Sequence, residues 1–511
     1  MHHFRAYRSL FPALTFAVLC GCSHVRHSPL QIGYWYWNTP FSLDRHQTTL
    51  LQQAGVTQLF VRAGTLTTDG KRVKEFISQQ WAGKADPFKL TLVFDFDAGL
   101  DRHFSEISQE TISSDAARAI AIVCQEARSK VGSYEGIQID ADVPTRLLPK
   151  FAWVLTDLRR RLTQAGTLQP GMKFSTTALA TWLRSSDYPK VAAACDYTVP
   201  QFYEGITGKD LADLQPISSP GQLSKDLGRA VRFGTPFWAG VACYGHALLF
   251  NKDGSLAATF HGFGPEKAVT NPSLAEESIG TVNSKSVEDA LVMRIAQSDE
   301  DGKWVGDRIA YILPTPDMLK KQLQVVESSP SDSCVGLILY RFPANEGPMA
   351  LPLETTVPIL RGADVHVKVK VNFTKASEPW ALMEGMQKSD KMPKSYTLRV
   401  RSIGDSPTLV SRSAARFLVL FDRRGIPDPE PGQFDSATPG SFDDGLFSPC
   451  SPANANAVLF TKAYLAPGDS LTSGTLSTDG DGATPMQVQW KVSPPDGARP
   501  ITGQFDLSDK P

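Results

Sequence analysis

The sequence predicts an α/β protein that combines a (β/α)8 TIM barrel with a C-terminal all-β, sandwich-like domain. Residues 30–345 alternate short β-rich runs with helical patterns, and eight such runs occur. Repeated βα units produce parallel strands covered by helices, and eight of them are typical of a barrel. After Pro343 the chain shows β-runs without convincing helices. We therefore expect a barrel over residues 31–350 and an accessory domain over residues 355–511.

The predicted barrel strands are runs rich in β-branched and aromatic residues. In chain order they cover residues 31–37, 57–62, 89–95, 136–140, 173–177, 196–203, 236–241 and 335–340. Apolar residues at helical spacing fill several of the intervals between them. The spacing predicts helices from Ser114, as a cap, to Lys130, from Leu148 to Gln164 and from Asp317 to Val326.

A long insertion, about residues 246–320, separates the seventh and eighth predicted strands. It begins with a hairpin pattern over residues 247–260, in which Asn251-Lys-Asp-Gly254 supplies the turn. Residues 287–298 are expected to form a helix. An insertion at this point would wall one side of the barrel mouth, where the active sites of this fold lie.

The C-terminal part is expected to form an antiparallel sandwich with one solvated face on each sheet. Its predicted strands cover residues 365–373, 396–400, 416–421, 457–464, 486–492 and 501–507. The interval from Arg424 to Asn456 is rich in Pro, Gly, Ser and Asp. We expect it to be a long loop.

The first 21 residues have the features of a secretory signal rather than of the fold. Arg5 and Arg8 precede an apolar run from Leu10 to Leu19, which is too short for a stable membrane-spanning helix. The following Leu19-Cys-Gly-Cys22 resembles the lipobox of bacterial lipoproteins. That resemblance implies lipidation of Cys22, a tether over residues 22–30 and, from Ser23, location at the outer membrane. The alternative is an ordinary signal cleaved nearby.

Composition excludes several classes of function. The formal net charge is −1, which does not favour nucleic acid as a partner. The sequence has no His-Glu-x-x-His, Cys-x-x-Cys, nucleophile elbow or phosphate loop, so we predict neither a metal nor a cofactor. Nothing in the sequence indicates an oligomeric state.

The segment Glu135-Gly-Ile-Gln-Ile-Asp-Ala-Asp-Val-Pro144 points most directly to a function. Side chains alternate along a strand, so Gln138, Asp140 and Asp142 would share one face. Two carboxylates at the end of a buried strand are costly unless they pair, bind a ligand or take part in chemistry. Structural bonds, or a helix cap at Asp142, are the alternatives.

Catalytic groups of barrels come from the C-terminal ends of the strands. The polar and aromatic residues at those ends are Trp35, Trp37, Asn38, Arg62, Asp95, Asp97, Asp140, Asp142, Thr177, Trp182, Gln201, Tyr203, Glu204, Tyr244, His246, Tyr340 and Arg341. Carboxylates among many aromatics are suited to carbohydrate, because sugar faces stack on aromatic rings and carboxyl groups cleave glycosidic bonds. Asp95 and Asp97 could form a second acidic pair, or one of them could be a loop cap, and Arg62 and Arg341 could serve only to neutralise the acids.

The decapeptide resembles the strand-four signature of family 18 glycoside hydrolases, Asp-Gly-x-Asp-x-Asp-x-Glu followed by Tyr-Pro. Gly136, Asp140 and Pro144 match, Gln138 replaces an Asp, and Asp142 stands where the catalytic Glu is expected. Gln201-Phe-Tyr-Glu204 resembles the family's Met-x-Tyr-Asp, and Tyr340 replaces a Trp. Residues 30–345 also resemble the uncharacterised bacterial domain-of-unknown-function family 3142. That resemblance rests on residues 138–145, Thr177-Ala-Leu-Ala-Thr-Trp182 and Tyr340-Arg-Phe-Pro343.

The hydrolase resemblance implies a role for each residue at the predicted mouth. Asp142 would be the general acid and Asp140 its partner, while Tyr203 and Glu204 would hold the substrate or transition state. The predicted substrate contacts are Trp37, Arg62, Asp95, Gln138, Gln201, Tyr340 and Arg341. Asp142 is one methylene shorter than Glu, and a misplacement of about 1 Å can cost roughly 10²-fold in rate.

Two functional hypotheses follow for the mature chain. The first is a lipid-anchored, exported glycoside hydrolase-like protein that acts on a polysaccharide or cell-envelope glycan. The second is a carbohydrate-binding lipoprotein of the same fold that has lost catalysis. An Asp142 carboxylate that reaches an open cleft favours the first, and one consumed by an Arg pair or a helix cap favours the second.

Overall fold

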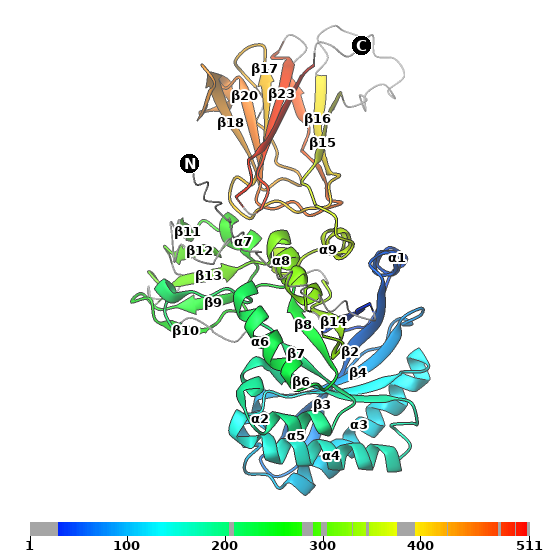
Figure 1. The fold of residues 1–511 in the computed structure, drawn as a ribbon. Helices are drawn as coiled ribbons and strands as arrows, with labels where there is room; N and C mark the ends of the chain where they lie inside the picture. Colours follow the sequence, from blue (N-terminus) through cyan, green and yellow to red (C-terminus); the bar gives the residue numbers. More distant parts are fainter. Residues whose placement is uncertain are drawn as a thin grey trace, which may run out of the picture.

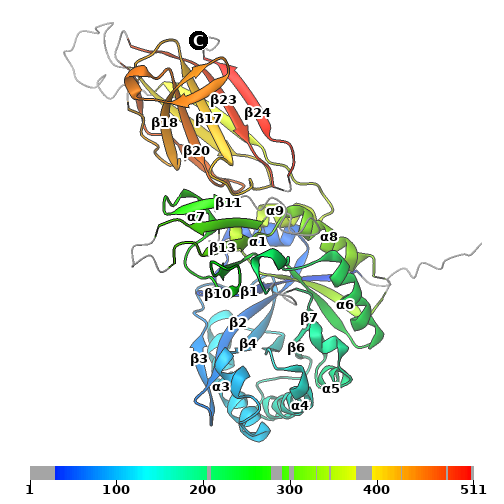
Figure 2. The same cartoon turned by 90° about the vertical axis from the view of Figure 1, so that its left-hand side faces the viewer.

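The computed structural model describes residues 29–203, 209–277, 290–297, 304–329, 331–343, 347–375, 394–426, 428–478, 482–495 and 497–507. Within these residues it contains a barrel, an inserted sheet and a two-sheet sandwich (Figures 1 and 2). No helix in the described part of the chain is long and apolar enough to cross a bilayer.

Eight parallel strands form the closed barrel in the order β1-β14-β8-β7-β6-β5-β4-β2, and pairing of β1 with β2 closes it. All eight predicted strands are confirmed, with small shifts at their ends except for β2, which extends to Thr68 where the prediction ended at Arg62. Their bounds are Gln31–Tyr36 (β1), Val56–Thr68 (β2), Lys89–Phe96 (β4), Gly136–Asp140 (β5), Lys173–Leu179 (β6), Tyr197–Gln201 (β7), Phe237–Ala242 (β8) and Cys334–Tyr340 (β14).

Helices cover the outside of the barrel, and their apolar faces bury the outward side chains of the strands. They are α1 (Arg45–Gln53), α2 (Ala98–His103), α3 (Gln109–Val131), α4 (Leu148–Gln164), α5 (Tyr188–Ala193), α6 (Pro220–Arg232), α8 (Pro316–Glu327) and α9 (Leu353–Leu360). The prediction for α4 is confirmed at both ends. The predicted start of α3 at Ser114 is wrong, because Ser108 accepts the capping bond from Thr111 N and Ser114 lies within the helix.

Strand β2 runs past the barrel wall and pairs antiparallel with β3 (Val73–Ser78), a hairpin that the sequence analysis missed. The extension carries Thr65 and Thr67, whose hydroxyls reach the carboxylates at the end of β4. One side of the barrel mouth is therefore built from this extension.

The insertion after the seventh barrel strand forms a separate antiparallel sheet in the order β10-β9-β13-β12-β11. Its strands are His246–Phe250 (β9), Leu256–Thr259 (β10), Leu274–Glu277 (β11), Ala290–Ile295 (β12) and Arg308–Ile312 (β13), and α7 covers Pro265–Thr270. The predicted hairpin is confirmed. The helix expected over 287–298 is wrong in its described part, because β12 occupies it. Leu291 and Val292 are buried in different clusters on opposite faces, so the run lacks the alternation that marks a half-buried strand.

The C-terminal part contains two antiparallel sheets that share one apolar core. The smaller sheet has β15 (Val369–Lys375), β16 (Lys394–Ser402), β21 (Ser470–Thr472) and β22 (Leu476–Thr478). The larger sheet has the order β19-β18-β20-β17-β23-β24. Its strands are Leu446–Pro449 (β19), Ser436–Asp443 (β18), Ala457–Lys462 (β20), Ala415–Phe421 (β17), Pro485–Val492 (β23) and Ile501–Asp506 (β24).

The long loop expected over residues 424–456 is wrong. The hairpin of β18 and β19 lies there, and β18 pairs with β20 across Pro439 and Gly440. The prediction from composition failed because cross-strand packing decides the structure of this segment, whatever the preference of Pro and Gly for loops.

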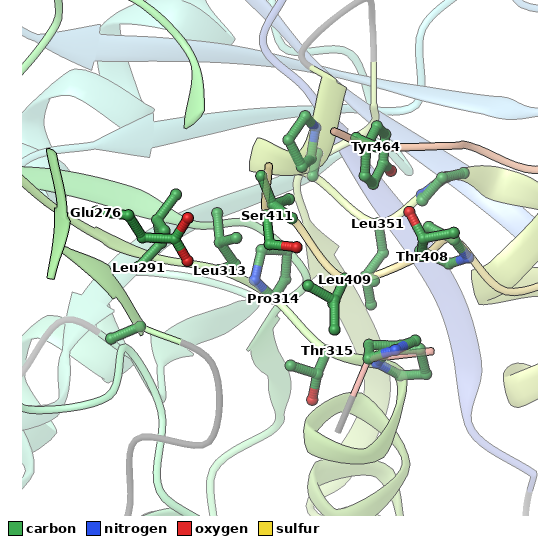
Figure 3. Close-up of a pocket in the computed structure, with 18 residues that line it drawn as sticks. Glu276, Leu291, Leu313, Pro314, Thr315, Leu351, Thr408, Leu409, Ser411 and Tyr464 are labelled. Carbon is green, nitrogen blue, oxygen red and sulfur yellow. The ribbon is translucent and has the colours of Figure 1, made fainter. Parts of the chain in front are cut away.

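The sandwich lies at one end of the molecule, and the inserted sheet lies between it and the barrel on one side (Figures 1 and 2). Val410 and Ala463 of the sandwich share an apolar cluster with Leu274 and Tyr311 of the insertion. A cavity of about 180 Å³ lies at this junction (Figure 3). Its lining comes from the insertion, the segment that follows the last barrel strand and the sandwich, and includes Leu291, Leu313, Leu351, Leu409 and Tyr464.

Candidate active site at the barrel mouth

Strand β5 places Asp140 at the mouth of the barrel. Ile137 and Ile139 face the helical layer, and Gln138 and Asp140 face inward. The Asp140 Oδ1 atom accepts a hydrogen bond of 2.6 Å from Thr177 Oγ1 on β6 and a longer one of 3.4 Å from Gln201 Nε2 on β7. Three adjacent strands thus converge on this carboxyl group.

Gln138 lies one layer deeper and is fully buried. Its Oε1 accepts a hydrogen bond of 2.8 Å from Trp35 Nε1, and its Nε2 donates to Ser175 Oγ at 3.4 Å. The amide is therefore engaged on both sides within the barrel core. In this geometry Gln138 supports the floor beneath Asp140 and does not reach the mouth.

Asp142 follows the strand in a loop whose backbone is held in place. Ala141 and Val143 are buried on either side of it, and Trp182 Nε1 donates to Val143 O at 3.0 Å. The Asp142 side chain is exposed, and among the described residues nothing donates a hydrogen bond to its carboxylate or forms an ion pair with it. The next helical turn begins after Pro144 without a side-chain cap, so Asp142 does not cap it.

Helix α2 adds a third carboxyl group that the sequence analysis missed. Asp101 faces the Asp142 loop, and its Oδ1 is buried without a hydrogen-bond partner among the described residues. The only indication in the sequence was its position in the first turn after the third barrel strand, at the same end as the other acids.

Asp95 and Asp97, at the end of β4, have different roles. Asp97 caps α2: its Oδ1 accepts from Leu100 N at 2.7 Å and its Oδ2 from Thr67 Oγ1 at 2.5 Å. Asp95 accepts a hydrogen bond of 2.9 Å from Thr65 Oγ1. Burial raises the pKa of Asp95, and the hydrogen bond from Thr65, followed by the charge of Arg62, partly opposes that rise.

The carboxyl groups at the mouth hold their protons more tightly than ordinary aspartates do. Burial, followed by the charge of Asp142, raises the pKa of Asp140 to about 8, although the bond from Thr177 opposes the shift. Burial and the Asp142 charge also raise the pKa of Asp101 to about 7. Asp142 itself is partly desolvated by its neighbours, and this raises its pKa. Interacting acids of this kind titrate as a group and share protons near neutral pH.

An aromatic cluster adjoins the carboxyl groups, with Tyr340 at its centre. The Tyr340 ring stacks on Tyr203 at 5.6 Å and meets Tyr244 edge-on at 4.9 Å. It also meets Trp35 and Trp37 edge-on, both at 5.7 Å. Because Trp35 bonds to Gln138 beneath Asp140, the cluster and the acids belong to one connected site.

The two predicted arginines lie against this cluster. The guanidinium of Arg341 lies 5.7 Å from the Tyr244 ring centre and 5.8 Å from that of Tyr340, and Arg62 lies 5.6 Å from the Trp37 ring. Tyr34 and Tyr36 point the other way, into the core under the helices. Of the four aromatic residues from Tyr34 to Trp37, the two tryptophans therefore belong to the barrel interior and its mouth.

Glu204 and Cys22 lie outside the described residues. His246 begins β9, and burial lowers its pKa to about 4. In the described part of the chain, no group of three or more His, Cys, Asp or Glu side chains is arranged to hold a metal ion.

No family model matches the chain, and no curated protein does. Solved structures match at low similarity. A chitinase from Chromobacterium violaceum is 14% identical with a TM-score of 0.41, covering 65% of this chain and 98% of its own. A chitinase from Bacillus thuringiensis is 10% identical with a TM-score of 0.41, covering 93% and 100%. The spore cortex-lytic enzyme SleL from Bacillus megaterium is 13% identical with a TM-score of 0.42, covering 66% and 74%.

Several of the matching structures are thus chitinases or related glycoside hydrolases, but at these scores the likeness assigns neither a substrate nor a residue role. The barrel itself is established by the strand order of this chain. The resemblance to family 3142 remains a prediction.

Proposed function

We propose that this protein is a glycoside hydrolase-like enzyme that acts on a polysaccharide or cell-envelope glycan. One observation carries the proposal. The carboxylate of the exposed Asp142, which has no hydrogen-bond or ion-pair partner among the described residues, lies with the buried, proton-retaining Asp140 at a barrel mouth lined by Tyr203, Tyr340 and Trp37. A proton source beside aromatic rings is what cleavage of a glycosidic bond requires.

In the proposed reaction, Asp142 donates a proton to the leaving oxygen as the glycosidic bond breaks. The oxygen of a water molecule then bonds to the anomeric carbon, and a proton from that water restores the Asp142 carboxyl group. Its raised pKa increases the protonated fraction at a given pH relative to an ordinary aspartate. Asp140 is its partner: with a pKa of about 8 it is mostly neutral at pH 7, so it does not repel the charge that Asp142 acquires. Tyr203 and Tyr340 hold the sugar, and Glu204 remains a candidate for the same role.

The experiment is a screen of the purified protein against peptidoglycan, chitin and exopolysaccharide fragments, with turnover and binding measured in parallel. We expect turnover of at least one fragment class, and loss of that turnover in Asp142→Asn. Binding without turnover in every class would instead support the rival hypothesis, a carbohydrate-binding protein that has lost catalysis.

We infer in addition that the protein is exported and lipid-anchored through Cys22, from the apolar run and lipobox-like residues 19–22. The test is labelling of cells with a radioactive fatty acid. We expect label on the wild-type protein and none on Cys22→Ala, with Cys20→Ala as the matched control. Equal labelling of wild type and Cys22→Ala would contradict the assignment.

A further inference from the structure

The larger sheet of the sandwich has an outer face that the proposed reaction does not use. On β17, Phe417 and Val419 enter the sandwich core, so Arg416, Leu418 and Leu420 point to the opposite face. The same alternation places Gln489 and Lys491 of β23 outward, because Val488 and Val492 are buried in the core. The residues of the outer face are therefore identified by the burial of the alternate residues of β17 and β23 in the sandwich core.

The pairing register arranges the outward side chains in rows across the strands. One row runs Thr461, Arg416, Lys491 and Thr502, and the next runs Leu459, Leu418, Gln489 and Gln504. The first row has two cationic side chains between two threonine hydroxyl groups. The second row has two leucines followed by two glutamine amides. A ligand lying across these strands would meet apolar contact at one end and hydrogen-bonding groups at the other.

The hairpin of β18 and β19 closes the apolar side. Phe442 and Phe447 pack over Leu418 and Leu459, and Leu446 at the turn is 72% exposed. Gly440 permits this arrangement, because a Cβ atom there would lie 2.5 Å from the Phe447 ring. The result is a groove of about 660 Å³ between the hairpin and the outward residues of β17, β23 and β24.

The charge in this groove is unbalanced. Arg416 and Lys491 lie directly opposite each other in the β17–β23 pair, and like charges in that position destabilise a sheet. Among the described residues, no carboxylate oxygen lies within 4.0 Å of either side chain's nitrogen atoms, and no described lining residue is acidic. Asp506, two residues beyond Gln504, accepts a hydrogen bond from Gln487, which in turn accepts one from Gln489.

We propose that this groove binds an acidic oligosaccharide, one whose sugar residues carry carboxylate groups. The carboxylate lies between Arg416 and Lys491, where it removes the repulsion of the two cations. An apolar sugar face packs on the Phe442 and Phe447 side, and hydroxyl groups bond to Gln489, Gln504 and Thr502. The site is independent of the barrel mouth and would hold the protein on an anionic glycan.

The test is calorimetric titration of the full purified protein with oligogalacturonate, a polymer of a carboxylated sugar, at low and physiological salt. We expect binding that weakens as salt rises, and at least a 10-fold weaker Kd for the double variant Arg416→Gln/Lys491→Gln. The matched control is Arg399→Gln/Arg401→Gln, which removes two exposed cations from the outer face of the smaller sheet. This control should bind as the wild type does.

Thermal unfolding separates loss of binding from loss of folding. The groove variant removes a like-charge pair, so its Tm should equal or exceed that of the wild type. Leu446→Ser, at the exposed turn, provides a second variant that should weaken binding without unfolding the sheet. Asp142→Asn should bind oligogalacturonate normally, so failure of the catalytic proposal would leave this one standing.

Three results would overturn the proposal. The first is no binding of oligogalacturonate at millimolar concentration. The second is an unchanged Kd in the groove variant. The third is binding of inorganic phosphate, an acidic peptide or vesicles of anionic lipid through Arg416 and Lys491 at affinities equal to that of the glycan, because the groove would then recognise charge alone.

Discussion

Asp140 is the residue whose environment departs most clearly from that of a surface aspartate. It is enclosed by three strands, and its pKa rises from 3.8 to about 8. In the folded protein it therefore keeps a proton between about pH 4 and pH 8 that the unfolded chain has released. Retention of this proton contributes to the free energy of unfolding. The contribution is present in full below about pH 4 and is lost as the pH rises through about 8.

Replacement of Asp140 by Asn should abolish the fall in stability that deprotonation of Asp140 causes as the pH rises. Between pH 4 and pH 8 the stability of the wild type should fall more steeply than that of Asp140→Asn. At pH 9 the variant should be more stable by on the order of 1–2 kcal/mol, because no buried charge forms. Urea unfolding across this pH range measures the difference. Parallel curves for the two proteins would show that the Asp140 carboxyl titrates as it does in the unfolded chain.

The sequence indicated which residues lie at the ends of the barrel strands. It was less informative about how far below the barrel mouth each side chain lies. Asp140 and Asp142 could be placed at the mouth because β5 is a short buried strand with clear alternation. The same alternation grouped Gln138 with them, but alternation indicates a face and not a layer, and Gln138 lies in the core below. Asp101 was missed because it lies on a helix and not at a strand end, and only the tertiary contact of α2 with the Asp142 loop brings its side chain to the site.

At the scale of elements, α2 is the short helix that brings Asp101 to the Asp142 loop, and Asp97 caps its start. We expect Asp97→Ala to lower the free energy of unfolding by about 1 kcal/mol, since the bond to Leu100 N is lost. Asp97→Asn is the control, because an amide oxygen still caps the helix. Equal stability of the Ala and Asn variants in chemical denaturation would mean that the cap contributes nothing.

The barrel strands could be predicted because each is a buried apolar run bounded by turn residues. The errors occurred where pairing partners decide the structure. Strand β12 is buried on two faces and so loses its alternation, and β18 contains Pro439 and Gly440 yet pairs with β20. The extension of β2 was missed because β3 stabilises it from outside the barrel.

At the scale of the whole molecule, Arg412 links the sandwich to the insertion. Its Nε donates to Val269 O at 2.8 Å and its Nη2 to Leu274 O at 2.6 Å, at the C-terminal end of α7 and just beyond it. A cation is favourable at that end of a helix, and the fork of the guanidinium reaches both carbonyls.

Arg412→Ala should lower the free energy of unfolding by about 1.5–3 kcal/mol, the range for hydrogen bonds that involve a charged group. Arg399→Ala, an exposed arginine on the smaller sheet, is the matched control and should change little. Thermal unfolding followed by limited proteolysis measures both effects. An Arg412→Ala variant with wild-type Tm and cleavage pattern would mean that the apolar junction alone holds the parts together.

The central claim is that Asp142 donates the proton that releases the leaving sugar. The most direct measurement is kcat for wild type and Asp142→Asn on the same glycan, and on an analogue with a nitrophenyl leaving group that needs little protonation. We predict a fall of roughly 100-fold or more on the glycan and a much smaller fall on the analogue, with binding unchanged. Wild-type turnover of the glycan by Asp142→Asn would contradict the assignment.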